Sequence, residues 1–223
     1  MSVATTTGRA AAALALMLAV FACALAPAAS ARKLQLGSNG VDVRHLKSSL
    51  ADLGYLPAGA VSRDFDQRTW HAVVAMQGWI GLPRDGVAGP RTRRALGVAV
   101  RPVPSSRRSG FEIHVRAQVL LIVRNGRTVR AIHVSTGAGD RTPYGHFGVY
   151  SRERMSWSKP FQTWMPFAQY FSGGFAMHEY PSVPAYAASH GCVRLPAQEA
   201  RVVWRYGRVG DRVWVMARHA PSR

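Results

Sequence analysis

The spacing of hydrophobic residues changes near Gly110, and this change limits the folds that the chain can adopt. Before Gly110, apolar residues recur every three or four positions, which is typical of helices that bury one face. After Gly110, apolar and polar residues alternate, which is typical of strands. The change predicts an α+β fold with two domains, a small three-helix bundle followed by a β-rich domain with one main helix.

The helical domain is expected to span residues 32–97. Its first helix has apolar residues at a 3-4-3 spacing and ends at Gly54. A second helix is predicted to begin near Asp66, and a third lies between Pro90 and Gly97, since proline is accepted in a first helical turn. The spaced residues of the first helix are Val43, Leu46, Leu50 and Leu53.

Residues 98–110 alternate Pro, Ser and Arg without a period, and they are predicted to form a linker. The β-rich domain is assigned to residues 111–217, and residues 218–223 form a tail. Asn125-Gly126 is typical of a tight hairpin, and Ala197–Tyr206 is the one helix expected here. The expected strands are Phe111–Val115, Val119–Val123, Val129–Ser135, Phe147–Ser151, Phe175–His178 and Asp211–Met216.

Residues 1–31 have the pattern of a secretory signal peptide. A single charge, Arg9, precedes an apolar run from Ala10 to Ala26, and Ala29-Ser30-Ala31 forms an A-x-A cleavage site. The run of 17 residues is shorter than the ~20 needed to span a bilayer, which favours cleavage near Ala31 over an uncleaved anchor. A lipoprotein attached through Cys23 is the other alternative, and the bulky Phe21 argues against it.

The charge of the chain is strongly positive. Its 223 residues contain 29 Lys plus Arg and 11 Asp plus Glu, and the formal charge is +18. Removal of the signal peptide, which holds Arg9 and no acidic residue, leaves +17. An exported chain of this charge is expected to meet a membrane or an anionic wall polymer rather than nucleic acid. The alternative is a coding bias toward arginine, with the side chains spread over solvated faces.

Cys192 is the remaining thiol once Cys23 is removed with the signal peptide, so no internal disulfide is expected. Two histidines precede it in the sequence, His190 by two positions and His178 by fourteen. A nucleophilic thiol needs such a base nearby. A buried cysteine that serves only as a small hydrophobe is the alternative.

The remaining histidines do not predict a metal site. His114, His133, His146 and His219 lack the spacing of metal ligands, and neither H-E-x-x-H nor C-x-x-C occurs. No glycine-rich phosphate loop follows a strand. We therefore predict no metal and no cofactor. In the helical domain, His45 and His71 are expected to be isolated and exposed.

The helical domain resembles the peptidoglycan-binding domain type 1 family. The strings LQLGSNGVDVRHLKSSLADLGYL and FDQRTWHAVVAMQGWIGLPRDGVAGPRTRRAL follow that family's motifs over the whole segment. Lys47 stands where the family usually has Gln, and Met76 stands where it has Phe. The resemblance implies the fold and peptidoglycan glycan strands as a partner, although a degenerate module that no longer binds is an open alternative.

The β-rich domain resembles the L,D-transpeptidase catalytic domain (the YkuD family), which implies a β-sandwich or barrel. Ser135-Thr136-Gly137, the string TPYGHF and the string SHGCVRL occur in the family's order, and the resemblance covers Phe111 to Met216. Tyr144 replaces the threonine that is commonest in the TPxG motif.

The resemblance implies acyl transfer on peptidoglycan stem peptides. Cys192 would attack the carbonyl of diaminopimelate or lysine at stem position three and expel D-Ala, and an amine would resolve the thioester as a 3→3 cross-link. His178 would be the base, oriented by the backbone carbonyl of Glu179. Anionic wall polymers remain a further possible partner.

The other residues of the motif have implied supporting roles. His190 and Gly191 would shape an oxyanion pocket with the amide of the nucleophile, and Ser189 would hold the turn. Arg194 would position the loop or a substrate carboxylate, or it would be a structural anchor under the site.

Tyr170 is the nearest candidate for a tyrosine that donates to the oxyanion. It belongs to the aromatic segment Ser156–Gly174, which is expected either to cover the substrate cleft or to pack beneath a loop.

Three alternatives to transpeptidation remain. An L,D-carboxypeptidase or another wall peptidase would use the same thiol with water as acceptor. A non-catalytic wall-binding protein would have an inert thiol. A zinc endopeptidase would need the metal-ligand spacing that the sequence lacks.

Overall fold

A computed structural model of the chain describes Met1 and residues 32–217. The remainder of the predicted signal peptide and the predicted tail lie outside the described residues. Within the described part, none of the helices is both long and apolar enough to cross a membrane.

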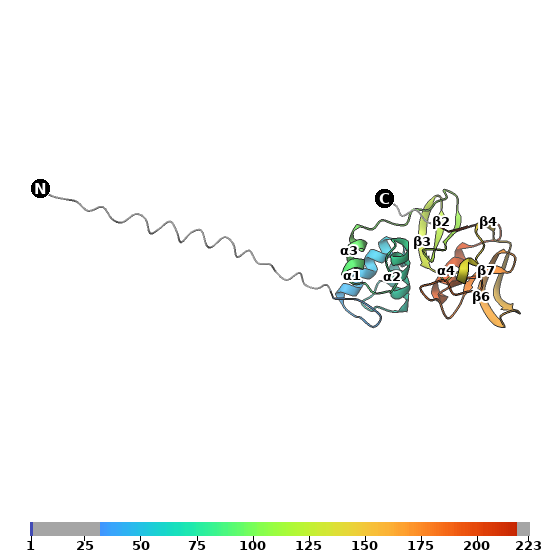
Figure 1. Ribbon diagram of the computed structural model, residues 1–223, viewed down its shortest axis with the longest axis horizontal. Coiled ribbons are helices and arrows are strands. Elements are labelled where there is room, and N and C mark those ends of the chain that lie inside the picture. Colours follow the sequence, from blue (N-terminus) through green and yellow to red (C-terminus); the bar gives the residue numbers. More distant parts are fainter. Residues whose placement is uncertain (2–31, 218–223) are drawn as a thin grey trace. The chain divides into compact units, whose positions relative to one another are not determined.

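The expected bundle consists of α1 (Val41–Asp52), α2 (Gln67–Trp79) and α3 (Pro90–Val98), with a short 3-10 helix between the first two (Figure 1). Asp66 caps α2, since its Oδ1 accepts hydrogen bonds from the backbone N–H and the hydroxyl of Thr69 at 2.8 and 2.6 Å. The three predicted helices are therefore present.

Lys47 is buried in the bundle, at the position where the related family usually has Gln. Its exposed fraction is 1%, and its Nζ donates to Ser62 Oγ at 2.8 Å and to the carbonyl of Asp64 at 2.9 Å. A buried ammonium group is stabilised only when such acceptors are present. Lys47 therefore anchors α1 to the loop that precedes α2.

The β-rich domain contains two sheets. The first has the order β3-β2-β1-β9-β4, in which β1 pairs parallel with β9, and the second has the order β5-β6-β7-β8. Helix α4 (Ala197–Tyr206) packs against β6 and β7, and it lies where the sequence predicts a helix. The strands are β1 (Gly110–His114), β2 (Val119–Arg124), β3 (Arg127–His133), β4 (Gly145–Gly148), β5 (Ser151–Ser158), β6 (Thr163–Ser172), β7 (Phe175–Glu179), β8 (Val193–Leu195) and β9 (Arg212–Met216).

The aromatic segment Ser156–Gly174 is mostly strand, although no strand is predicted there from the sequence. It includes the end of β5 and all of β6, which form an antiparallel hairpin. Pro166 and the left-handed residue Phe167 (φ +56°) interrupt the alternation of polar and apolar residues that identifies a strand. The strands are therefore hidden in the sequence but are needed to complete the second sheet.

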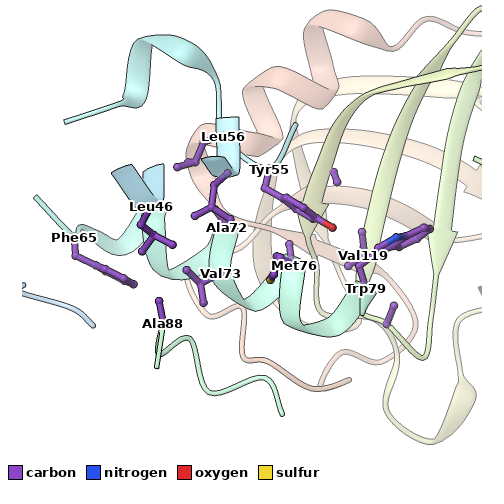
Figure 2. Close-up of a cluster of buried hydrophobic side chains, with 14 of the residues drawn as sticks. Leu46, Tyr55, Leu56, Phe65, Ala72, Val73, Met76, Trp79, Ala88 and Val119 are labelled. Carbon is purple, nitrogen blue, oxygen red and sulfur yellow. The ribbon is translucent and has the colours of Figure 1, made fainter. Parts of the chain in front are cut away.

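The helical bundle shares a hydrophobic core with β2 and β3. Val119 and Leu121 of β2 are buried in one cluster with Val73, Met76 and Trp79 of α2. Figure 2 shows Val119 beside Met76 and Trp79. The burial of these apolar side chains joins the helical domain to the outer face of the first sheet.

A buried carboxylate connects the two domains at β3, the edge strand of the first sheet. Glu199 of α4 lies 2.7 Å from Nη2 of Arg130 on β3 and 2.9 Å from Nη2 of Arg68 on α2. Arg130 also donates to the carbonyl of Gly54 at 3.1 Å. Glu199 and Arg130 are both buried, so each charge depends on the other for its stability.

His71 is partly buried against the β-rich domain, and the expectation that it is isolated and exposed is wrong. Its Nδ1 lies 2.8 Å from Nδ1 of His133 on β3, the two rings stack, and Trp70 packs edge-on against both. His45 is exposed as expected. The difference arises because α2 faces a sheet that lies far away in the sequence.

Candidate active site

Cys192 lies in a cavity of about 730 Å³ beside the second sheet. It directly precedes β8, is half-buried and is a free thiol. Its Sγ lies 3.8 Å from the carbonyl oxygen of Gly174. Six of the predicted site residues line this cavity: Tyr170, His178, Ser189, His190, Cys192 and Arg194. The seventh, Gly191, is buried and does not line it.

The parallel pairing of β7 with β8 places His178 and Cys192 on neighbouring segments that line one cavity. Met177 pairs with Val193 and His178 with Arg194, so that Cys192 stands next to the strand that carries the histidine. His178 is 4% exposed, and its Nδ1 lies 2.7 Å from the carbonyl oxygen of Glu179. A carbonyl can only accept, so Nδ1 carries the proton and Nε2 is left as a proton acceptor.

Burial shifts Cys192 and His178 toward their neutral forms. It raises the pKa of the Cys192 thiol, and the backbone N–H of Ala176 and the charge of Arg194 oppose this shift. Burial lowers the pKa of His178 to about 4; the hydrogen bond to Glu179 opposes this shift, whereas Arg194 adds to it. Both shifts favour a thiol and a neutral imidazole over a preformed thiolate–imidazolium pair at neutral pH.

The turn that presents the thiol requires a glycine. Gly191 has φ +136°, and a Cβ there would lie 2.1 Å from Cε1 of Phe175. The hydroxyl of Ser189 accepts from the N–H of Gly191 at 3.0 Å and donates to the carbonyl of Cys192. Ser189 thus closes the turn on both sides, and the Gly191 amide is engaged within it.

Two upstream motifs support this turn from below. The hydroxyl of Thr142 accepts from the N–H of Gly137 and donates to the carbonyl of Gly191, both at 2.8 Å. The N–H of Ala138 donates to the carbonyl of Ser189 at 2.9 Å. The motifs predict no role for these residues, and in the structure they pack against the turn that precedes Cys192.

Arg194 lies over the ring of Tyr180, with 4.2 Å between its guanidinium carbon and the ring centroid. Its backbone exchanges two hydrogen bonds with Ser135. Its side chain lines the cavity and is only partly exposed. Tyr180 was not singled out from the sequence, and its place two residues after His178 was the available signal.

The β5–β6 hairpin borders the cavity. The hydroxyl of Tyr170 lies 2.8 Å from Ser156 Oγ, and burial raises the pKa of Tyr170. The exposed His190 stacks on Phe161 at 4.5 Å between ring centroids. The aromatic segment therefore contributes to the wall of the cavity. Among the described residues, no group of three or more His, Cys, Asp or Glu side chains could hold a metal ion.

Two family models match the chain. Residues 109–215 match the L,D-transpeptidase catalytic domain (YkuD), and residues 39–96 match a peptidoglycan binding domain (PG_binding_1). A curated relative, the probable N-acetylmuramoyl-L-alanine amidase of Bacillus licheniformis, is 36% identical over 67 residues. That match covers 30% of this chain and 19% of the relative's length.

Solved structures match over most of the chain. The L,D-transpeptidase from Xylanimonas cellulosilytica is 38% identical with a TM-score of 0.78, and the match covers 83% of this chain and 98% of that one. The L,D-transpeptidase from Stackebrandtia nassauensis is 23% identical with a TM-score of 0.52. That match covers 85% of this chain and 97% of the other chain, and it supports the fold alone. The chain therefore belongs to the L,D-transpeptidase family, with a YkuD catalytic domain preceded by a peptidoglycan-binding domain.

Proposed function

We propose that the chain is an exported cell-wall L,D-transpeptidase that forms 3→3 cross-links in peptidoglycan, with Cys192 as nucleophile and His178 as base. The observation that carries the proposal is the shared cavity of the two side chains, in which the Glu179 carbonyl fixes the imidazole tautomer. The family assignment supports an enzyme that acts on peptidoglycan.

Acylation begins when the Cys192 thiol transfers its proton to Nε2 of His178. The sulfur attacks the carbonyl carbon of the third residue of the donor stem, and a C–S bond forms. The C–N bond to D-Ala then breaks, and the imidazolium returns the proton to the leaving amine. Before this transfer, burial favours the neutral forms of both the thiol and the imidazole.

Deacylation repeats the proton transfers with a second stem. The side-chain amine of the acceptor attacks the thioester and gives up a proton to His178, the C–S bond breaks, and the sulfur recovers the proton. Water in place of the amine would yield an L,D-carboxypeptidase product. The cavity of about 730 Å³ is large enough to admit peptide chains beside the thiol.

The oxyanion of each tetrahedral intermediate needs hydrogen-bond donors. Because the Gly191 N–H donates to Ser189, we assign the donors to the Cys192 amide and the Tyr170 hydroxyl, with His190 shaping the outer wall. Arg194 would attract a substrate carboxylate toward the cavity while its stacking on Tyr180 holds it in place.

The test is incubation of the chain from residue 32 with muropeptides that carry tetrapeptide stems, followed by mass spectrometry. A dimer that has lost one D-Ala supports transpeptidation, and a tripeptide supports carboxypeptidation. Cys192→Ala should abolish either product. If no product depends on Cys192, the enzyme assignment fails and a non-catalytic wall-binding role replaces it.

The base is tested separately by acylation of Cys192. His178→Ala should abolish the acyl-enzyme, whereas His45→Ala, which alters an exposed histidine of the helical domain, should leave it intact. Equal loss in both variants would contradict the assignment of His178. Export is tested by N-terminal sequencing of the protein recovered from outside the membrane, with cleavage expected near Ala31.

A further inference from the structure

A second pocket, of about 360 Å³, lies where α4 meets the β5–β6 hairpin. We call it the arginine pocket. Arg154 of β5 lies on one side, Arg201 and Arg205 of α4 lie on the other, and Phe167 and Trp204 complete the lining. None of these residues lines the catalytic cavity.

The three arginines of the pocket are not neutralised by the protein. All three are exposed, and none forms an ion pair or a side-chain hydrogen bond within residues 32–217. Among residues 32–217, the one cation–π contact of their guanidinium groups is that of Arg201 over the ring of Phe167, at 5.9 Å. No acidic residue lines the pocket. Three like charges around one hollow repel one another, so the arrangement favours an anion.

The surroundings of the pocket add positive charge. The guanidinium of Arg152 lies 3.8 Å over the ring of Trp204 and donates to its carbonyl at 2.6 Å. The nearby acid Glu199 is already bound to Arg68 and Arg130. The carboxylate of α4 is therefore not available to the exposed arginines on the same helix.

The aromatic lining of the pocket consists of Phe167 and Trp204, and the backbone holds Phe167 in place. Phe167 has φ +56°, a conformation unfavourable for a bulky residue, and it lies between the register pairs Glu153–Ala168 and Met155–Pro166. Its ring packs edge-on against Trp204 with 5.9 Å between centroids. Unfavourable backbone conformations of this kind concentrate at binding sites, where the surrounding structure enforces them.

We propose that the arginine pocket binds the phosphate groups of an anionic phosphodiester polymer of the cell envelope. Planar guanidinium forks match phosphate oxygens, and a phosphodiester keeps its charge throughout the physiological pH range. A polymer presents successive phosphates, and the pocket is larger than one phosphate needs. The proposal rests on the export that the proposed function includes.

The β5–β6 hairpin contributes residues to both the arginine pocket and the cavity that contains Cys192. Strands β5 and β6 carry Arg154 and Phe167 into the arginine pocket and Trp157 and Met165 into the catalytic cavity. A polymer bound at the arginine pocket would hold the same hairpin that borders the thiol. The enzyme would thereby be retained next to wall material that carries phosphate.

The test is binding of poly(glycerol phosphate) to the chain from residue 32 with Cys192→Ala, measured by isothermal titration calorimetry at ~0.15 M salt. Arg201→Gln/Arg205→Gln should weaken binding by at least roughly tenfold, as expected for lost hydrogen bonds to a charged group. Arg154→Gln, on the opposite side of the pocket, should weaken it in the same direction. Circular dichroism and thermal unfolding check that each variant folds.

The matched control is Arg91→Gln/Arg94→Gln on α3, which removes the same charge from two exposed positions. It should bind nearly as well as the parent. Equal loss in the control would mean that net charge alone drives binding, and the proposal would be wrong. Equal binding of poly-L-glutamate would show that the pocket does not select phosphate, which also overturns it.

Vesicles that contain phosphatidylglycerol distinguish a membrane from a polymer. If they bind more tightly than poly(glycerol phosphate) and depend on Arg201 and Arg205, the partner is a lipid surface and the proposal fails. With Cys192 intact, the Arg201→Gln/Arg205→Gln chain should process soluble muropeptides like the parent. Failure of the polymer interaction is thereby distinguished from failure of the proposed enzyme activity.

Discussion

Replacement of Gly191 by alanine should destabilise the catalytic turn through two separable effects. The residue has φ +136°, and an L-residue there carries a backbone cost of about 1–2 kcal/mol. The new Cβ would also lie 2.1 Å from Cε1 and 2.6 Å from Cδ1 of Phe175, and such overpacking costs about 1–3 kcal/mol. We expect the free energy of unfolding to fall by about 2–5 kcal/mol in total.

Gly210→Ala is the matched control for the backbone effect. Gly210 also has a positive φ, +92°, but a Cβ there would meet nothing within 4 Å. Its cost should therefore be the backbone cost alone, about 1–2 kcal/mol. The double variant Gly191→Ala/Phe175→Ala lacks the ring that the methyl group would strike. Its cost should be smaller than the sum of the two single costs.

Urea-induced unfolding measures the free energies, and the rate of Cys192 alkylation by iodoacetamide reports the geometry of the turn. Gly191→Ala should change the alkylation rate, whereas Gly210→Ala should not. If Gly191→Ala costs no more than Gly210→Ala, or if the double variant shows strictly additive costs, the close approach of Phe175 does not constrain the turn and the reasoning is refuted.

Three further predictions concern stability, each measured by urea-induced unfolding. Thr142→Val should cost about 2–3 kcal/mol because two buried backbone partners lose their hydrogen bonds, and Thr142→Ser should recover most of it. Glu199→Ala should cost about 3–5 kcal/mol because Arg130 is left buried and unpaired, and Glu199→Leu/Arg130→Met should be much milder; equal costs would contradict this. Burial lowers the pKa of His71 and His178 from 6.5 to about 4. Between pH 6.5 and about pH 4, the unfolded chain therefore binds more protons than the folded chain does. The free energy of unfolding should therefore fall as the pH decreases in this window, by about 1.4 kcal/mol for each histidine and each pH unit. His71→Gln should make this pH dependence less steep.

The local signals of the sequence predicted most elements of the fold. Asp66 and Pro90 mark the starts of two helices because a capping carboxylate and a first-turn proline act within a few residues. Ala197–Tyr206 is predicted as a helix from its one-sided apolar face, and its bounds agree with those of α4. Such signals depend on neighbours along the chain, so a single sequence is enough to read them.

The β5–β6 hairpin and the environment of His71 could not be predicted in this way. Pro166 and Phe167 break the strand alternation, and the hairpin joins the second sheet through the pairing of β6 with β7. The partner of His71 is His133, which lies 62 residues away in the sequence. Contacts between distant segments depend on which surfaces are buried together, and no local pattern encodes that choice.

The sequence by itself determined the two-part α+β organisation, the family resemblances and the candidate residues around Cys192. Only the tertiary structure decided how they meet. The parallel pairing of β7 with β8 brings His178 and Cys192 into one cavity, and the Thr142 hydroxyl supports the turn at Gly191. The arginine pocket arises in the same way, because α4 and the β5–β6 hairpin carry like charges to one hollow that neither segment forms alone. Helices and turns follow from short-range sterics and hydrogen bonds, whereas sites follow from the burial of whole surfaces against each other.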